Sequence, residues 1–186
     1  MIPSFIETYI IQDKKICDDL INYHKNEKEY KTEGKVGTIE GIKLLPDVKE
    51  SIDVIFHNDT QNDTIKNFFK ELNNCLRHYV KKYSLNHSIK TEYCNMISMF
   101  PPLGGYKIPH YERTRIAKTK RQLVYMLYLN DVNDGGQTEF IHQNLIIKAE
   151  KGKLVLWPSD FTHLHRGIVS PTETKYIATG WLELIS

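Results

Sequence analysis

Hydrophobic residues recur at helical spacing near the start of the chain. Ile16, Leu20 and Ile21 fall on one face of such a helix. Asp13 can cap its start, so we expect the helix to run from there to about Tyr30. The pattern therefore predicts that the chain opens with a helix that buries one side.

A second, longer amphipathic helix is predicted after a polar loop. The loop covers 56–63, with the sequence FHNDTQND. Asp63 or Thr64 is the expected cap, and the helix runs to about Tyr83. Its apolar face consists of Ile65, Phe68, Phe69, Leu72, Leu76, Tyr79 and Val80.

The pattern changes to short apolar runs from about residue 90, separated by glycine and proline. These runs predict strands over 93–100, 122–129, 145–148, 154–157, 167–169 and 176–184. Asp134-Gly135-Gly136 predicts a turn. We expect a mainly β sandwich or barrel with two helices on one outer face, forming a single domain over 1–186. Helical support is expected over about 1–88 and the β core over about 89–186.

Composition narrows the class of protein. The 186 residues carry a net charge of +2, which suits one globular domain and indicates neither nucleic acid nor membrane as a partner. No apolar run is long enough for a transmembrane helix, and we expect no secretory signal at the start. Cys17, Cys75 and Cys94 are odd in number and widely spaced, which predicts reduced thiols and a cytoplasmic location.

A histidine and an acid two residues apart occur twice. With 8 His and 23 acidic residues, about one such pair is expected by chance. His57 and Asp59 lie in the polar loop, where a solvated pair is the simpler interpretation. His110 and Glu112 follow a glycine turn, and on a strand they would point to the same side. They either face one metal ion or form a half-exposed structural pair.

A third ligand has to come from later in the chain. His163 and His165 would lie on the same side of a strand, and we choose His165 because Lys175 follows ten residues later. His163 is expected to pack nearby or to hydrogen-bond a ligand. Two histidines and a carboxylate with open positions are typical of non-haem Fe(II) oxygenases. The remaining histidines, His24, His78, His87 and His142, are expected on surfaces or helices.

Lys175 suggests the co-substrate. A buried ammonium group is tolerable only with an ionic partner, so an inward lysine here implies an acidic ligand such as the far carboxylate of 2-oxoglutarate. The alternative is an exposed strand lysine.

Together these stretches resemble the prolyl 4-hydroxylase-type 2-oxoglutarate/Fe(II) dioxygenases, especially small bacterial and phage-encoded members. The segments that carry the resemblance are GYKIPHYE (105–112), RQLVYMLYLND (121–131), GGQTEF (135–140), KGKL (151–154), LWP (156–158), HRG (165–167), KYI (175–177) and GW (180–181). The resemblance implies a double-stranded β-helix, that is, a cupin-like jelly-roll. It also implies Fe(II) bound by His110, Glu112 and His165, with O₂ and 2-oxoglutarate as co-substrates and ascorbate as a candidate reductant.

The resemblance also implies the residues around the co-substrate. Lys175 would bind its far carboxylate, Thr138 and Tyr128 would line the same pocket, and Trp181 would border the site. Two positions depart from the family pattern. Glu112 stands where aspartate is usual, and Phe100 stands near a place where tyrosine is common.

A basic stretch follows Glu112 and consists of Arg113, Arg115, Lys118, Lys120 and Arg121. It is either a solvated, mobile loop or an electrostatic handle for an acidic substrate. Arg113 and Arg115 are therefore candidate substrate-binding residues. Arg166 adjoins His165 and is either structural or a further substrate-binding residue. Trp157 and Phe140 are expected in the core.

The leading hypothesis is a dioxygenase that hydroxylates a C–H bond, with a peptidyl proline as the family-based substrate. A peptide or protein substrate is favoured over a small molecule. A non-catalytic metal- or ligand-binding module on the same fold is one alternative. A nucleic-acid demethylase is another, although lysine at 175 argues against it and makes nucleic acid an unlikely partner.

Overall fold

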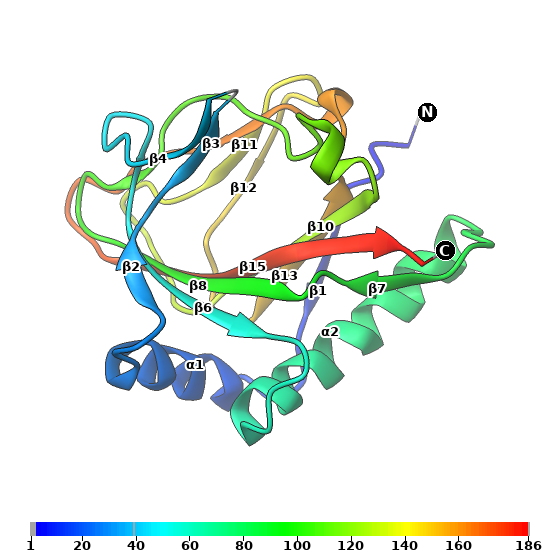
Figure 1. The fold of residues 1–186 in the computed structure, drawn as a ribbon, viewed down its shortest axis with the longest axis horizontal. Coiled ribbons are helices and arrows are strands. Elements are labelled where there is room, and N and C mark those ends of the chain that lie inside the picture. Colours follow the sequence, from blue (N-terminus) through cyan, green and yellow to red (C-terminus); the bar gives the residue numbers. More distant parts are fainter. Residues whose placement is uncertain (1–2, 39, 186) are drawn as a thin grey trace.

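A large antiparallel sheet forms the base of the molecule in the computed structural model, which describes residues 3–38 and 40–185 (Figure 1). Its strand order is β1-β13-β10-β15-β8-β6-β2, and β7 pairs with β15 beside this path. The strands are β1 (Glu7–Ile10), β2 (Lys31–Glu33), β6 (Ile52–His57), β7 (Ile89–Thr91), β8 (Cys94–Phe100), β10 (Arg121–Tyr128), β13 (Lys153–Pro158) and β15 (Lys175–Leu184).

A smaller sheet lies across from the large one, and Figure 1 shows its strands above β15 and β13. It has the order β12-β11-β14, with β11 (Thr138–Phe140) between β12 (Leu145–Ile147) and β14 (His165–Gly167). Two short antiparallel pairs complete the fold. They are β3 (Val36–Thr38) with β4 (Gly41–Lys43), and β5 (Lys49–Glu50) with β9 (Gly105–Tyr106). Two facing antiparallel sheets of this kind form the expected jelly-roll.

Both helices cover the outer face of the large sheet (Figure 1). They are α1 (Lys15–Asn26) and α2 (Asp63–Lys82), and Asn62 caps α2 by accepting a hydrogen bond from the Ile65 N–H. Apolar side chains of both helices share one core with the outward-facing residues of the sheet. Among the described residues, no helix is both long and apolar enough to cross a membrane.

Strand β10 shows how the chain builds two cores at once. Leu123, Tyr125 and Leu127 belong to the core beneath the helices. Val124 and Tyr128 belong to a second core between the two sheets. Phe140 of β11 and Trp157 of β13 belong to the same core. Successive strand residues point to opposite faces, so a strand buried on both faces is a continuous apolar run. This explains why residues 123–129, LVYMLYL, carry no charged side chain.

The structure corrects the expectation of a helical first part. Strands β1, β2 and β6 precede residue 60 and extend the large sheet, so the strand core draws on the chain before residue 89. The predicted polar loop begins too early, because Phe56 is buried and His57 still belongs to β6. The first helix ends at Asn26 rather than near Tyr30, and the cap of α2 is Asn62.

Two smaller corrections concern the later strands. Strand β11 was not predicted, and β14 begins at His165, two residues before the expected start. His24 lies on helix α1, which agrees with its expected place on a surface or helix; it is buried, and its Nε2 lies 2.9 Å from the Ile52 carbonyl oxygen. The imidazole therefore joins α1 to the edge of the large sheet.

Candidate metal and co-substrate site

His110 and Glu112 lie in an extended segment after β9, outside the named strands. The backbone N–H of His110 donates to the His165 carbonyl at 2.9 Å, and the N–H of His165 donates to the His110 carbonyl at 3.0 Å. The Glu112 N–H donates to the Ser159 carbonyl at 3.1 Å. Main-chain contacts to β14 and to the end of β13 thus replace the expected strand in positioning this pair.

The side chains of His110, Glu112 and His165 meet between the two sheets. Glu112 Oε1 is 3.5 Å from His110 Nε2 and 3.7 Å from His165 Nε2. One donor atom from each residue lies within 4.8 Å of the other two. This donor set, two imidazole nitrogens and one carboxylate oxygen, is the set that Fe(II) takes in facial-triad sites.

Backbone carbonyl oxygens determine which ring nitrogen of each histidine faces the centre of the site. His110 Nδ1 lies 3.0 Å from the Ile108 carbonyl oxygen, and His165 Nδ1 lies 2.8 Å from the His163 carbonyl oxygen. A carbonyl oxygen only accepts, so each Nδ1 carries the proton and each Nε2 presents its lone pair to the centre. Partners of this kind are what metal-binding histidines require.

The protonation states also suit a cation. Burial and the neighbouring His110 lower the pKa of His165 to about 4, so the ring is neutral at neutral pH. Burial by itself would raise the pKa of Glu112, but the neighbouring His110 and the positive charge of Arg121 hold it at about 2. His165 therefore supplies a neutral nitrogen and Glu112 an ionised oxygen.

Aromatic rings surround the histidines. The Tyr106 ring stacks on His110 with ring centroids 3.6 Å apart. Phe140 and Trp157 lie 5.5 and 5.1 Å from the His165 ring, and both are buried as expected. These rings leave the imidazoles little freedom to turn and keep water from their outer sides.

Lys175 is buried at the start of β15, and 6% of its surface is exposed. Its Nζ donates to the Gly136 carbonyl at 3.0 Å, and no carboxylate pairs with it among the described residues. Burial lowers the pKa of this ammonium group to about 8. The Tyr128 and Thr138 hydroxyls lie 2.6 Å apart, and Thr138 follows Gly136 by two residues. A buried ammonium with no carboxylate partner among the described residues fits the carboxylate of a bound dicarboxylic acid.

Phe100, which stands near a place where the family often has tyrosine, pairs with Lys175 across β8 and β15. The Lys175 Nζ lies 5.1 Å from the Phe100 ring centroid. The ring therefore covers the lysine but offers no hydroxyl to a ligand.

Trp181 contacts the second carboxylate oxygen of Glu112. Its indole N–H donates to Glu112 Oε2 at 2.9 Å. Arg121 Nη1 lies 3.5 Å from the same oxygen, and the guanidinium carbon lies 3.5 Å from the Trp181 ring centroid. Arg121 is itself paired with Glu92. Glu92 could not be predicted as part of the site, because its partner Arg121 lies in a strand far along the chain.

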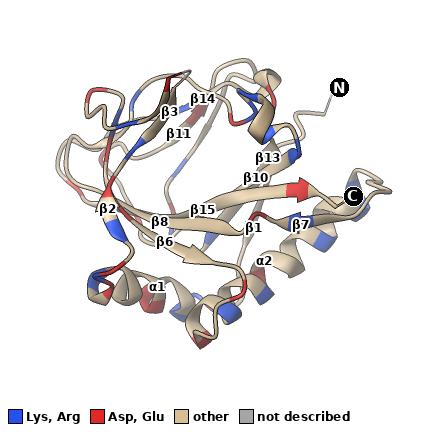
Figure 2. Ribbon diagram, in the orientation of Figure 1, with Lys and Arg blue, Asp and Glu red and all other residues tan. Residues whose placement is uncertain are grey.

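The basic stretch is less free than expected. Figure 2 shows it on the loop that carries the short helix η1 (Ile116–Lys118). Arg121 is buried at the start of β10, which corrects its placement in a solvated loop. Lys118 also pairs with Glu92, at 2.9 Å. Arg113 Nε donates to Asp160 at 2.9 Å.

Arg115 and Arg166 differ in their surroundings. Arg115 is exposed and lies across Gly37 of β3, where a Cβ atom would stand 2.3 Å from its Nη2. Arg166 is exposed and donates to Glu139 at 2.6 Å. Two of the three candidate substrate arginines, Arg113 and Arg166, thus face acids of the protein itself.

His163 does not share a strand with His165. It belongs to a short helix, η2 (Phe161–His163), and its Nε2 lies 2.9 Å from the Ser4 carbonyl oxygen. It reaches the candidate metal site only through its own carbonyl, which accepts from His165 Nδ1.

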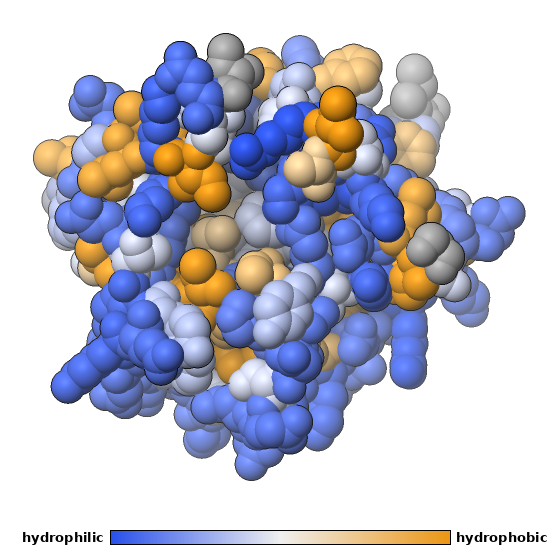
Figure 3. All heavy atoms as spheres, in the orientation of Figure 1, coloured by the Kyte–Doolittle hydropathy of each residue, from blue (hydrophilic) through white to orange (hydrophobic). Residues whose placement is uncertain are grey.

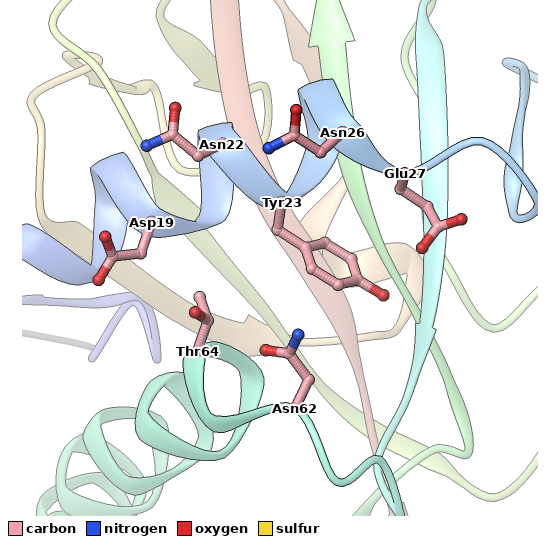
Figure 4. A pocket seen from close by; sticks show the side chains of 7 residues that line it. All are labelled: Asp19, Asn22, Tyr23, Asn26, Glu27, Asn62 and Thr64. Carbon is pink, nitrogen blue, oxygen red and sulfur yellow. The ribbon is translucent and has the colours of Figure 1, made fainter.

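The molecular surface is hollowed between the two sheets (Figure 3). A separate depression lies on the outer side, between α1 and the start of α2 (Figure 4). Its lining is polar and consists of Asp19, Asn22, Tyr23, Asn26, Glu27, Asn62 and Thr64. These side chains are exposed or half-exposed, which is typical of a solvated groove between helices.

Comparisons with known proteins agree with this site. Residues 95–183 match the family model described as the 2OG-Fe(II) oxygenase superfamily. The human prolyl 4-hydroxylase subunit alpha-3 is 26% identical over a stretch that covers 43% of this chain and 18% of the human protein. The chain therefore spans less than a fifth of this curated relative.

Solved structures share the fold. A viral collagen prolyl hydroxylase from Paramecium bursaria Chlorella virus-1, in complex with 2OG, has a TM-score of 0.73 at 20% identity and covers 97% of each chain. A Trichoplax adhaerens prolyl hydroxylase, in complex with a hypoxia inducible factor peptide fragment, has a TM-score of 0.75 at 17% identity. That match covers 97% of this chain and 84% of the other. His110, Glu112, His165 and Lys175 fall within the family match, and the chain is similar to the 2OG-Fe(II) oxygenase superfamily over residues 95–183.

Proposed function

We propose that this protein is a 2-oxoglutarate- and Fe(II)-dependent dioxygenase that hydroxylates a C–H bond of a peptide or protein, with a prolyl residue as the target. The observation that carries the proposal is that His110, Glu112 and His165 meet in a fold that also buries Lys175, and that Lys175 has no carboxylate partner among residues 3–38 and 40–185. A metal-binding site without an acidic co-substrate would leave the buried ammonium group of that lysine without an ionic partner.

Each residue then has a defined part. His110, Glu112 and His165 would hold Fe(II), through two Nε2 atoms and Oε1. Lys175 would bind the far carboxylate of 2-oxoglutarate, and the hydroxyls of Thr138 and Tyr128 would donate hydrogen bonds to it. When bound, the iron and 2-oxoglutarate together supply the chemistry that activates O₂.

The protein's own contribution is orientation and the exclusion of water. Phe140, Trp157 and Phe100 are buried next to the ligand histidine and the lysine. A dry surrounding strengthens the attraction between the Lys175 ammonium and a carboxylate. It also protects a reactive site from side reactions with solvent.

A peptide substrate is supported by the surface between the sheets. The hairpin of β3 and β4 and the loop with η1 flank the hollow (Figures 1 and 3). They carry Ile42 and Ile116, which are 70% and 89% exposed, so the entrance offers apolar as well as charged contacts. The Trichoplax adhaerens neighbour was solved with a peptide fragment, which supports a polypeptide in the same groove.

The nucleic-acid alternative loses support from the structure. Lys118 and Arg121 share Glu92, and Arg113 pairs with Asp160, so little of the basic stretch is available to phosphates. Cys17, Cys75 and Cys94 are free thiols, which supports the predicted cytoplasmic location as part of this proposal.

Turnover tests the proposed activity. The protein is incubated in air with Fe(II), 2-oxoglutarate and pools of proline-containing peptides, and succinate and peptide mass are measured. We expect iron-dependent succinate and a gain of one oxygen atom in a subset of peptides. The His165→Ala variant, shown to be folded, should give neither. A folded wild-type protein that binds iron but makes no succinate with any pool would instead indicate the non-catalytic module.

A further inference from the structure

The two oxygens of Glu112 have different surroundings. Oε1 faces the Nε2 atoms of both histidines, at 3.5 and 3.7 Å. Oε2 points the other way and accepts from the Trp181 indole at 2.9 Å, with Arg121 Nη1 at 3.5 Å. The carboxylate is therefore oriented before any ion arrives.

Arg121 is held firmly enough to act as a fixed support. Its side chain is 7% exposed, and its Nη2 and Nε contact Glu92 at 2.6 and 3.3 Å. Its guanidinium plane packs on the Trp181 ring, with the central carbon 3.5 Å from the ring centroid. One face and three nitrogens of the guanidinium are thus in use, so this arginine has little freedom to move.

The length of Glu112 makes such support necessary. Glutamate has one more rotatable bond than aspartate, so its carboxylate can turn to offer a cation one oxygen or both. Facial-triad chemistry needs open positions for the co-substrate and for O₂. A second carboxylate oxygen on the ion would occupy one of those positions.

We propose that Arg121 and Trp181, supported by Glu92, are positioning residues that hold Glu112 Oε2 away from the metal. Glu112 then binds the ion through Oε1 alone. The inference rests on the proposed function, because it assumes that His110, Glu112 and His165 bind a metal. It assigns to part of the basic stretch a role inside the site rather than at the substrate entrance.

Cobalt(II) provides a readout that does not depend on turnover. The intensity of its visible absorption bands reports the number of ligands, and titration gives the affinity. Trp181→Phe removes the hydrogen bond to Oε2 but keeps an aromatic ring beneath Arg121. Arg121→Lys keeps the positive charge but cannot contact Glu92, Glu112 and the ring together. Lys120→Met is the matched control, because it removes an exposed cation of the same stretch that has no carboxylate partner among the described residues.

We expect both site variants to bind cobalt(II) about 10- to 100-fold more weakly and with altered band intensity. The Lys120→Met protein should match the wild type. Far-ultraviolet circular dichroism and thermal unfolding show whether each variant is folded. If one of them fails to fold, the other decides.

Two negative results are distinguishable. A wild-type protein that binds no cobalt(II), or binds it equally well as His165→Ala, would overturn the proposed function and this inference with it. Wild-type binding that depends on His165, together with folded Trp181→Phe or Arg121→Lys proteins of unchanged affinity and spectrum, would overturn the positioning role alone.

Discussion

The main chains of His110 and His165 exchange two hydrogen bonds, at 2.9 and 3.0 Å. This is the hydrogen-bonded pair of an antiparallel ladder, and it occurs at a single point outside the named strands. It brings the two imidazoles side by side, with ring centroids 4.4 Å apart. The spacing of the two histidines is therefore set by backbone contacts between segments far apart in the sequence.

Loss of the Lys175 ammonium should abolish tight binding of 2-oxoglutarate. We expect Lys175→Met to bind it about 10- to 100-fold more weakly, because a charged hydrogen bond contributes roughly 1.5–3 kcal/mol. Thermal shift with a redox-inert divalent metal and increasing 2-oxoglutarate measures the effect. Lys90→Met, on the exposed face of β7, is the control and should respond like the wild type. Equal stabilisation of Lys175→Met and wild type by 2-oxoglutarate would refute this role.

The stability of the ligand-free protein should depend on pH through the same lysine. Its pKa is about 8 in the folded state, against an ordinary value of 10.5. Between these values the unfolded chain holds a proton that the folded protein has lost, so this group adds stability as pH rises. The loss of folding stability caused by burying the charged ammonium is therefore greatest below pH 8 and disappears by about pH 10.5.

Lys175→Met isolates that contribution from other titrating groups. We expect the variant to be more stable than the wild type below pH 8, by about 3 kcal/mol. The difference should fall toward zero by about pH 10.5. Urea unfolding at a series of pH values gives both free energies. A difference that stays constant over this range would show that the lysine keeps its ordinary pKa.

A buried ion pair near the site should be important for stability. Lys49 Nζ contacts Asp53 at 2.5 Å, and both side chains are almost fully buried. Asp53→Asn leaves the ammonium unpaired, and we expect a loss of roughly 3–5 kcal/mol in the free energy of unfolding. The exposed Lys15–Asp19 pair supplies the control, because Asp19→Asn should cost about 1 kcal/mol or less. Similar losses in both variants by urea unfolding would contradict this account.

Only part of the basic stretch should affect substrate binding. Arg115 is exposed, and neither it nor Lys120 has a carboxylate partner among the described residues. Their joint replacement by alanine should weaken binding of an acidic peptide and reduce its dependence on salt. Fluorescence anisotropy at several salt concentrations measures both. Unchanged salt dependence would show that this loop does not attract the substrate by charge.

Much of the fold follows from local pattern. The long amphipathic helix α2 and strands β8, β10, β13 and β15 were predicted within a few residues, because each has enough residues to show its period. The strands of the first part were missed for the opposite reason. Strands β1 and β2 have four and three residues and gain their stability from neighbours in the large sheet.

The candidate site shows the same limit. The histidines, Glu112 and Lys175 were found because their chemistry and spacing are informative in one dimension. The Arg121–Glu92 pair and the Lys49–Asp53 pair were not, because each depends on which strands become neighbours. A run of five basic residues indicates a solvated face, yet tertiary structure buries Arg121 against Trp181.

The most direct test of the central claim is an anaerobic titration of the protein with Fe(II) and 2-oxoglutarate, followed by visible absorption. We predict a metal-to-ligand charge-transfer band that saturates at one iron per chain. The band should be lost in folded His165→Ala and should need far more 2-oxoglutarate in Lys175→Met. A folded wild-type protein that shows no such band would contradict the assignment of this site to iron and 2-oxoglutarate.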